Sequence, residues 1–399
     1  MTVSGANTPF VAIACGGTGG HLFPGLAVAE QLQKRGCAVA LLVSPKDVDQ
    51  EAVKSVRDME IITLPAVALQ HHNYFSFARS FWQSWRLSKA IFKSRPPQAV
   101  LAMGGFTSAP PILAAKAFGA RTFLHESNTI PGRANRFLAR LVDEAFIGFP
   151  AAAARLRARK VTATGTPVRP EFQPGETAPC RAAFRLESDR PTILVMGGSQ
   201  GATGINDLIL SALPLLGNRT ATWQWLHLTG SGDVEKVRQA YAARGFKAVV
   251  KPFLKEMDMA LGAATIAVSR AGASSLAEIA AVRLPSLLVP YPTAADNHQF
   301  FNAQAFESTG AARMLEQKNA APDKVAALLC ELLEAPAARA KIQTALAQWH
   351  APRAAEQIAE IMLAAIAPCP EATAGRVRPA SGSGGGIDPS TKLASSTAV

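Results

Sequence analysis

The chain has 399 residues, a length that predicts two domains or one large domain. Hydrophobic residues make up 48% of it and charged residues 18%, a composition that excludes a wholly disordered chain and a fibrous protein. Its five cysteines are scattered and never form a C-x-x-C spacing, which argues against a disulfide framework and a zinc site. No apolar run approaches the ~20 residues of a bilayer span and the N-terminus lacks signal-peptide features, so we expect a cytoplasmic protein.

The positive charge is concentrated in the first half of the chain. Of the formal net charge of +12, residues 1–170 carry 20 basic and 9 acidic side chains, against 21 and 20 in residues 171–399. A basic half beside a neutral one is compatible with nucleic acid, an anionic membrane or a phosphorylated substrate. Composition alone does not choose among these partners.

Short apolar runs bounded by turn residues recur along both halves, as buried parallel strands do. They are residues 10–15, 38–43, 99–103, 121–124 and 144–147, and then residues 192–196, 225–228, 248–250, 266–268 and 286–289. Helical patterns alternate with them, the first over residues 24–34. The alternation predicts an α/β fold built from two doubly wound units.

Proline and glycine interrupt all periodicity between about residues 165 and 190, where we expect the two units to meet. The sequence therefore predicts a first domain over residues 1–170 and a second over residues 171–345, followed by a helix over residues 346–366. Residues 367–399 are rich in Gly, Ser and Thr and predict a disordered tail.

Each half opens with a strand, a glycine-rich loop and a helix. The loops are residues 16–20 and 197–201. Their backbone N–H groups, next to the positive end of a helix dipole, predict phosphate binding, and tight turns that only pack helix on strand are the alternative. The first loop does not fit G-x-G-x-x-G in register and no P-loop Gly-Lys-Ser/Thr follows, which argues against dinucleotide and ATP sites.

The second loop also leaves a serine hydrolase open. Gly197-Gly-Ser199-Gln-Gly201 matches G-x-S-x-G between a strand and a helix, the setting of a nucleophilic serine. A hydrolase would further need a histidine and an acid. The chain offers, none of them in an obvious triad context, His227, His298 and His350 with Asp233 and Asp296.

Two polar segments in the second half complete the candidate site. In residues 269–278, a glycine permits a tight turn, Ser274 and Ser275 can cap a helix or bind phosphate, and Glu278 can accept hydrogen bonds from a ribose diol. A plain helix cap is the alternative. Residues 296–302 place five polar side chains beside a strand end, which indicates that something is hydrogen-bonded there.

Together these motifs resemble the MurG family, the N-acetylglucosaminyltransferases of bacterial peptidoglycan synthesis. The resemblance runs in order over about residues 10–365 and is carried by residues 16–29, 103–106, 125–128, 165–169, 197–202 and 270–278. It implies a GT-B fold, two Rossmann-like doubly wound domains facing across a cleft, with UDP-N-acetylglucosamine held mainly by the second domain and a lipid-linked acceptor by the first. The chain departs from the family at Ser127, Thr166 and Ser274-Ser275, where Gln, Asn and Leu-Thr are more usual.

The resemblance implies a set of contacts to UDP-N-acetylglucosamine. The diphosphate would lie on Ser199 and the start of the 273–278 helix, and the uracil on the backbone of Leu254. Glu278 would hold the ribose, and Asn128 and Gln299 the sugar. The whole set is Thr18, Gly19, Gly20, Asn128, Arg169, Ser199, Leu254, Ala273, Ser274, Ser275, Leu276, Ala277, Glu278 and Gln299.

The reaction that the resemblance implies is a single displacement with inversion. The C4 hydroxyl of N-acetylmuramic acid, on an undecaprenyl diphosphate that carries the muramyl peptide, attacks C1 of the donor sugar with the help of one base. His21 is the first candidate because of its ordinary pKa, and Glu126 is the second; a structural histidine and a binding carboxylate are the alternatives. No Asp-x-Asp stands where a metal would bridge a diphosphate, so we expect no metal and no cofactor. A UDP-sugar epimerase of the same fold is the runner-up.

Residues 74–95 predict a membrane-docking helix. They hold seven aromatic side chains, five basic ones and no acid. One helical face would carry Phe77, Phe81, Trp85, Ser88 and Phe92, with Arg79, Arg86, Lys89 and Lys93 mostly at its sides. We expect the membrane-facing residues to be Phe77, Phe81, Trp82 and Trp85.

A core helix is the alternative, and the docking surface would then be sought at Arg133, Arg136 and Arg140. No nucleic-acid motif accompanies the stretch, so no nucleic-acid partner is expected. The resemblance implies a peripheral protein on the cytoplasmic face of the bacterial inner membrane, bound to an anionic surface. Contacts with other cell-wall synthesis proteins stay open.

Overall fold

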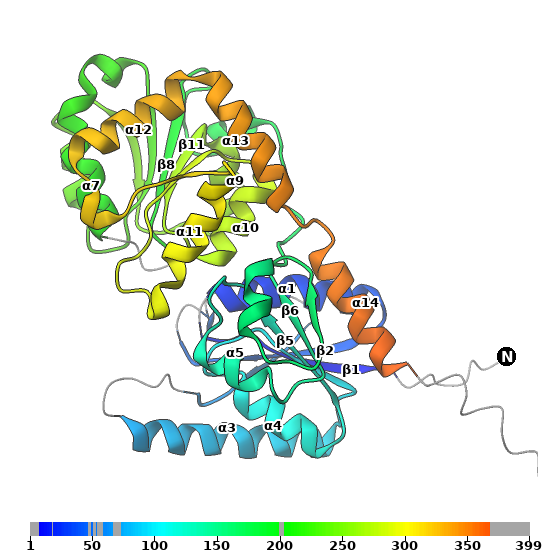
Figure 1. Ribbon diagram of the computed structural model, residues 1–399. Coiled ribbons are helices and arrows are strands. Elements are labelled where there is room, and N and C mark those ends of the chain that lie inside the picture. The colour runs from blue at the N-terminus through cyan, green and yellow to red at the C-terminus, as the bar shows by residue number, and fades with distance from the viewer. Residues whose placement is uncertain are drawn as a thin grey trace, which may run out of the picture. The chain divides into compact units, whose positions relative to one another are not determined.

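The computed structural model describes residues 8–17, 19–46, 49–50, 53, 59–66, 73–198 and 203–367 of the chain. Two parallel sheets organise these residues, with strand orders β3-β2-β1-β4-β5-β6-β7 and β10-β9-β8-β11-β12-β13, and helices pack around each sheet (Figure 1). In both sheets the order reverses beside the strand that opens the unit, between β1 and β4 and between β8 and β11. The predicted α/β fold with two doubly wound units is confirmed.

The first sheet contains all five strands predicted for it and two more at its edges. The strands are β1 (Phe10–Ala14), β2 (Ala38–Val43), β3 (Glu60–Thr63), β4 (Ala99–Ala102), β5 (Arg121–Glu126), β6 (Glu144–Ile147) and β7 (Val161–Ala163). The helices are α1 (Gly19–Lys34), α3 (Tyr74–Ser94), α4 (Ala109–Ala117), α5 (Arg133–Leu138) and the 3-10 helix η1 (Pro150–Arg155). Helix α1 begins at Gly19 rather than at Pro24, which lies inside it.

The second sheet contains the five predicted strands and the short edge strand β13. Its strands are β8 (Thr192–Met196), β9 (Gln224–Leu228), β10 (Lys247–Lys251), β11 (Ile266–Ser269), β12 (Ser286–Leu288) and β13 (Arg313–Met314). The helices after β7 are α6 (Thr177–Ala183), α7 (Thr203–Ala212), α8 (Val234–Ala242), α9 (Met257–Ala263), α10 (Ala273–Val282), α11 (His298–Ser308), α12 (Pro322–Glu334), α13 (Pro336–Trp349) and α14 (Ala354–Ile366). The short 3-10 helices are η2 (Leu213–Ala221), η3 (Ala295–Asn297) and η4 (Gln317–Asn319).

The last helix returns to the first sheet. The helical stretch expected over residues 346–366 comprises the end of α13 and the whole of α14, and α14 packs along α1 and against β5 (Figure 1). Its buried side chains Ile358 and Met362 belong to the same apolar cluster as Val11 and Ile13 of β1. The predicted disordered tail over residues 367–399 lies, apart from Ala367, outside the described residues.

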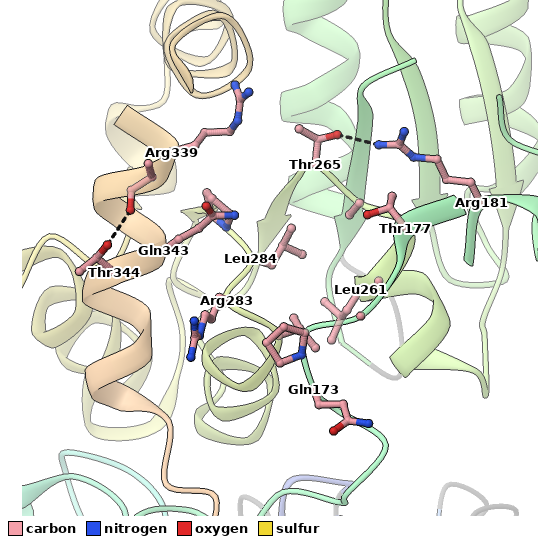
Figure 2. A pocket seen from close by; sticks show the side chains of 17 residues that line it. Gln173, Thr177, Arg181, Leu261, Thr265, Arg283, Leu284, Arg339, Gln343 and Thr344 are labelled. Carbon is pink, nitrogen blue, oxygen red and sulfur yellow. Dashed lines mark hydrogen bonds between the residues drawn. The ribbon is translucent and has the colours of Figure 1, made fainter. Parts of the chain in front are cut away.

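A cavity of about 620 Å³ borders the amino ends of β11 and β12. Figure 2 shows three arginines at its wall, Arg181, Arg283 and Arg339, whose guanidinium groups point in different directions; that of Arg181 donates to Thr265 Oγ1 at 3.0 Å. The glycine loops and the polar turns follow the opposite, carboxyl ends of the strands. This cavity is therefore not where the doubly wound fold binds its ligands.

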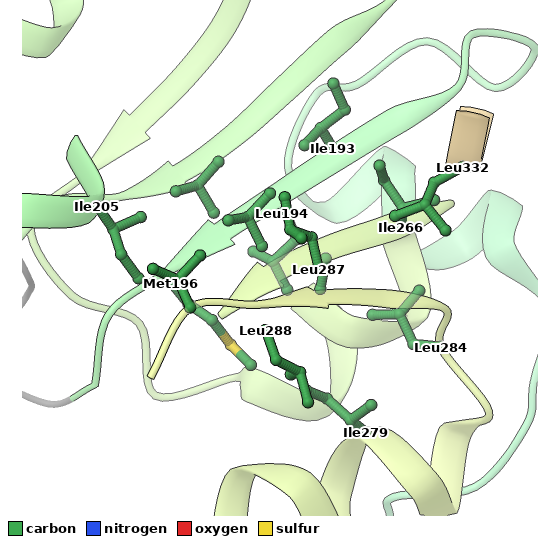
Figure 3. Packing of buried hydrophobic residues seen from close by; sticks show 14 of the residues in the cluster. Ile193, Leu194, Met196, Ile205, Ile266, Ile279, Leu284, Leu287, Leu288 and Leu332 are labelled. Atoms are coloured by element: carbon green, nitrogen blue, oxygen red, sulfur yellow. The ribbon is translucent and has the colours of Figure 1, made fainter. Parts of the chain in front are cut away.

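The strands are predictable because they are buried on both faces. In the second sheet, Ile193 and Leu194 of β8, Ile266 of β11 and Leu287 of β12 are all fully buried and pack together (Figure 3). Neighbouring side chains along one strand point to opposite faces, so a strand with helices on both sides needs an unbroken apolar run. This packing fixes the strand ends, and thereby the turns that carry the polar residues.

Candidate active site

The polar residues singled out in the sequence follow the carboxyl ends of adjacent strands. In the first sheet these strands are β1, β4 and β5, and in the second β8, β11 and β12. Ligands of doubly wound folds bind at such ends, next to the point where the strand order reverses. Thr18 and Ser199 lie outside the described residues, whereas the other predicted site residues are described.

His21 lies half-buried in the first turn of α1, after β1. Its ring lies against the backbone of Gly104 and Gly105, and a Cβ atom on Gly104 would come within 2.9 Å of the ring carbon Cε1. Both glycines have positive φ, so the Met-Gly-Gly sequence after β4 makes room for the ring. Burial lowers the pKa of His21, with Glu126 opposing, and its Nδ1 has no hydrogen-bond partner. The neutral ring is the form that can accept a proton.

Glu126 ends β5, and the protein supplies four hydrogen bonds to its carboxylate. Oε1 accepts from the backbone N of Asn128 at 2.8 Å and from its Nδ2 at 3.1 Å. Oε2 accepts from the backbone N of Gly132 at 3.0 Å and from Nδ2 of Asn135 at 2.8 Å. Such a carboxylate organises the loop between β5 and α5, which favours positioning over proton transfer. Sequence reasoning missed Asn135, because nothing local marks an asparagine that bonds nine residues back.

The first glycine loop is held in place by side chains from two other strand ends. The buried Asp49 accepts from the backbone N of Gly17 at 2.5 Å and from Ser44 Oγ at 2.5 Å. Thr107 Oγ1 donates to the carbonyl oxygen of Gly16 at 2.7 Å. A Cβ atom on Gly16 would lie 2.3 Å from the backbone N of Ser44, so only glycine fits there. Asp49 has no signal in the sequence beyond its place after an apolar strand.

In the second sheet, the turn from β11 into α10 carries an uncompensated positive charge. Arg270 is buried and donates through Nη1 to the carbonyl oxygens of Val289 and Pro290 at 3.0 and 3.1 Å, and through Nη2 to Gln317 Oε1 at 2.9 Å. None of the carboxylates in the described ranges pairs with this guanidinium. Helix α10 begins at Ala273 with no side-chain cap, so its first N–H groups and Arg270 together favour an anion.

Glu278 lies one turn into α10, at a position that disfavours its ionised form. Burial raises its pKa to about 7; nearby Arg169 opposes the rise and Glu171 adds to it. Arg169 pairs with Glu171 at 2.8 Å, lies over the ring of Phe23 at 4.9 Å and has a buried Nε without a partner. The carboxyl group of Glu278 therefore has an unusually high free energy when ionised, which a ligand donating hydrogen bonds would lower.

Two further predicted residues, Gln299 and Leu254, are arranged so that only some of their polar groups are available to a ligand. Gln299 uses its carbonyl oxygen, which accepts from the backbone N of Ala271 at 3.2 Å and of Tyr291 at 3.0 Å, and this leaves its amide N–H groups to donate. Leu254 follows β10 and buries its side chain in the second core, so only its backbone can serve a ligand. Within the described residues, no group of three or more His, Cys, Asp or Glu is placed to hold a metal ion.

Helix α3 corrects the predicted membrane face. Ser88 and Phe92, placed on that face from the sequence, are fully buried, and Trp85 packs partly against the first core because α3 lies along α4 (Figure 1). Trp82 is exposed over 52% of its surface and Phe75 over 84%. Phe77 and Phe81 are half-buried and contact each other. The exposed side of the helix, which we call the outer face of α3, carries Tyr74, Phe75, Arg79, Trp82, Arg86, Leu87, Lys89 and Lys93.

For the part of the chain that is described, no helix has both the length and the apolarity to span a bilayer.

Comparison with known proteins identifies both halves of the chain. Residues 11–147 match the glycosyltransferase family 28 N-terminal domain, and residues 192–358 match the glycosyltransferase family 28 C-terminal domain. The UDP-N-acetylglucosamine–N-acetylmuramyl-(pentapeptide) pyrophosphoryl-undecaprenol N-acetylglucosamine transferase of Anaeromyxobacter sp. (strain K) is 36% identical over 359 residues, 88% of this chain and 91% of its own. The protein of the same name from Myxococcus xanthus is 33% identical, again over 88% and 91%.

Solved structures agree in fold. MurG of Acinetobacter baumannii superposes with a TM-score of 0.70 and 26% identity, covering 89% of this chain and 99% of its own. A UDP-N-acetylglucosamine 2-epimerase reaches a TM-score of 0.65 at 13% identity, covering 90% and 96%, a likeness of fold alone. The GT-B fold is thereby confirmed, and the epimerase alternative has the weaker support. The chain belongs to the MurG family of N-acetylglucosaminyltransferases, within glycosyltransferase family 28.

Proposed function

We propose that this protein transfers N-acetylglucosamine from UDP-N-acetylglucosamine to the C4 hydroxyl of N-acetylmuramic acid, carried with its peptide on undecaprenyl diphosphate. The observation that carries the proposal is that, in a chain of this family, both sheets present functional groups at the carboxyl ends of their strands. The first sheet presents a half-buried histidine with a lowered pKa, and the second an uncapped helix N-terminus with a glutamate one turn in. We propose that residues 1–170 hold the acceptor and that residues 171–345 hold most of the donor.

For the donor, we assign the diphosphate to the start of α10, where Ser274 and Ser275 are half-buried and the helix dipole favours negative charge. Ser199, Thr18, Gly19 and Gly20 join it from the two glycine loops in this proposal. Glu278 takes the ribose hydroxyls, and the backbone of Leu254 takes the uracil. Asn128 and the free amide N–H groups of Gln299 take the sugar.

For the chemistry, the acceptor O4 attacks C1 of the sugar while the bond from C1 to the UDP oxygen breaks, and the configuration at C1 inverts. We assign His21 as the base that takes the proton of the C4 hydroxyl, because an imidazole whose pKa is lowered from 6.5 is mostly neutral at pH 7. Glu126 acts through the loop that it organises, since all four of its hydrogen bonds are made within the protein.

The leaving UDP gains negative charge as the bond breaks. We propose that Arg270, which has no carboxylate partner among the described residues, and the first N–H groups of α10 stabilise that charge together. Arg169 adds a second cation, and its buried Nε lacks a partner. Groups fixed in place in this way need no reorganisation when the charge develops.

The test is transfer of labelled sugar from UDP-N-acetylglucosamine to a lipid-linked muramyl acceptor, with the acceptor omitted as the control. Formation of the labelled disaccharide supports the proposal. Free 2-epimerised sugar without acceptor would indicate an epimerase instead. A hydrolytic activity that Ser199→Ala abolishes would indicate a serine hydrolase. Against that alternative, His227 is buried and already bonds to Asn206 and Tyr241 at 2.9 and 3.0 Å.

We further propose that the outer face of α3 docks on an anionic membrane surface on the cytoplasmic side, where the lipid-linked acceptor resides. The helix contains no acidic residue, and Arg86 and Lys89 lie over the rings of Trp82 and Trp85 at 4.6 and 4.9 Å. Exposed Phe75 and Trp82 supply the apolar part of an interfacial helix and the basic residues the electrostatic part.

A further inference from the structure

Asn302, in the polar segment that the sequence singled out, makes an unusually complete set of contacts. It lies in α11 and is fully buried. Its Oδ1 accepts from the backbone N of Thr129 at 2.9 Å and from Thr129 Oγ1. Its Nδ2 donates to Asn128 Oδ1 at 3.0 Å and to the carbonyl oxygen of Ala271 at 3.1 Å. All four hydrogen-bonding positions of the amide are therefore used, and none is left for a substrate.

These four bonds join two parts of the chain that each carry proposed site residues. Asn128 and Thr129 follow β5 in the first sheet, whereas Ala271 lies in the turn between β11 and α10 in the second. The turn at Ala271 also donates its backbone N to Gln299. One buried side chain thus connects the loop with Asn128 to the turn that leads into α10.

The bond to Asn128 also fixes which way the Asn128 amide faces. Its Oδ1 points to Asn302 and its Nδ2 to Glu126 Oε1, so the amide cannot turn over without placing like groups together on both sides. A second contact between the same parts, Arg136 with Asp296 at 2.7 Å, is exposed and does not fix the orientation of an amide side chain. Surface ion pairs of this kind contribute little.

We infer that Asn302 is a positioning residue for the donor sugar: it orients the Asn128 amide and holds the loop after β5 against the turn before α10. This inference rests on the proposed function, because Asn128 is assigned there to the sugar. Asn302 itself does not touch substrate. Its effect should therefore depend on the sugar being present and on Asn128.

The first experiment is Asn302→Asp, which keeps the shape but replaces the donor Nδ2 with an oxygen that faces two acceptors. We expect transfer at low donor concentration to fall about tenfold or more, as for a lost buried hydrogen bond. We expect the Kd of UDP-N-acetylglucosamine to rise while the Kd of UDP stays within about twofold. Equal weakening of both ligands would overturn the inference, because a merely structural role would not distinguish them.

The second experiment is a double-mutant cycle with Asn128→Ala. If Asn302 acts through Asn128, the effect of Asn302→Asp is several-fold smaller when Asn128 is already alanine. Fully additive effects would contradict the inference. Thr129→Val is the matched control, since it removes one hydroxyl donor to Asn302 and leaves the bond to Asn128; we expect kinetics within about twofold of the parent.

Thermal unfolding accompanies each variant, and Asn302→Ser replaces Asn302→Asp if the latter does not fold. Kinetics of a folded variant equal to those of the parent would overturn the inference while leaving the proposed function intact. A parent protein that transfers no sugar would instead contradict the proposed function.

Discussion

The carboxyl ends of the two sheets differ in how the protein compensates the charged side chains that lie there. In the first sheet, Glu126 accepts four hydrogen bonds and Asp49 holds the glycine loop. In the second, Arg270 has no carboxylate partner among the described residues, and Glu278 has a pKa raised to about 7 by burial.

The difference separates a scaffold from a site that a ligand completes. A carboxylate that accepts four hydrogen bonds, as Glu126 does, holds the loop after β5 in one geometry, and such a fixed frame helps a base such as His21 to meet a hydroxyl at one place. Buried charges without partners cost free energy until an oppositely charged or hydrogen-bonding ligand arrives. We therefore expect the loss of His21 to lower turnover, and the loss of Glu278 to weaken donor binding.

The largest effect is expected for His21→Ala. Loss of a general base lowers turnover by ~10²–10⁴. The donor Kd should stay close to that of the parent, because in our assignment His21 does not contact UDP. Single-turnover transfer assays and calorimetry measure the two quantities. Near-normal turnover would move proton transfer to Glu126 or to solvent and would erase the contrast between the two sheets.

The next effect is expected for Glu278→Ala. It removes a charged hydrogen-bond acceptor from the ribose, worth about 1.5–3 kcal/mol, so the Kd of UDP should rise about 10- to 150-fold. Glu235→Ala, an exposed glutamate on α8, is the control with no expected change. An unchanged UDP affinity in titration calorimetry would exclude Glu278 from the site.

Much of the fold could be predicted because its strands are buried on both faces and read as apolar runs. The missed strands β3, β7 and β13 are short edge strands whose residues are only partly buried, so their sequences carry no such run. The return of α14 to the first sheet depends on the whole fold, since its apolar stripe would serve either sheet equally well.

The site was predictable only where loops carry recognisable chemistry. Asn302 was noticed as part of a polar segment, but its partner Thr129 lies 173 residues away in the chain. For α3, the aromatic stripe indicated that one face of the helix differs from the others, but it did not indicate which side of the helix faces the core and which faces solvent. Ser84 and Ser88 face inward because α4 packs closely along that side, so Trp82 and Arg86 on the other side of the helix are exposed.

A smaller effect is expected at the outer face of α3. Removing two basic residues, in Arg79→Ser with Arg86→Ser, should weaken cosedimentation with anionic liposomes by about 30-fold at low salt, since each contributes about 1 kcal/mol near the surface. Phe75→Ser with Trp82→Ser should also weaken it, with little change in the thermal midpoint, because both side chains are exposed. Arg244→Ser on the second domain is the control.

Lipid binding that is insensitive to salt and to these four substitutions would contradict the docking proposal. Charges at an exposed surface are screened over about 10 Å at 0.1 M salt, so binding through the outer face must fall as salt rises. If instead Arg133→Ser and Arg140→Ser abolish binding, the surface lies on α5 and the two residues that follow it.

The smallest effect is a pH dependence that belongs to the second sheet alone. With its pKa near 7, Glu278 is mostly protonated at pH 6 in the free protein, and a protonated carboxyl can accept fewer hydrogen bonds from the ribose. UDP affinity should therefore rise by up to about tenfold from pH 6 to pH 8, with release of a proton that calorimetry in buffers of different ionisation enthalpy detects.

The free energy of unfolding of the free protein should change with pH in the opposite direction. The folded pKa lies above the ordinary value of 4.5, so the stability due to protonated Glu278 is fully present below pH 4.5 and is lost as pH rises through about 7. Glu278→Gln should flatten both profiles between pH 5 and pH 8, and profiles that keep their slope in this variant would place the titrating group elsewhere.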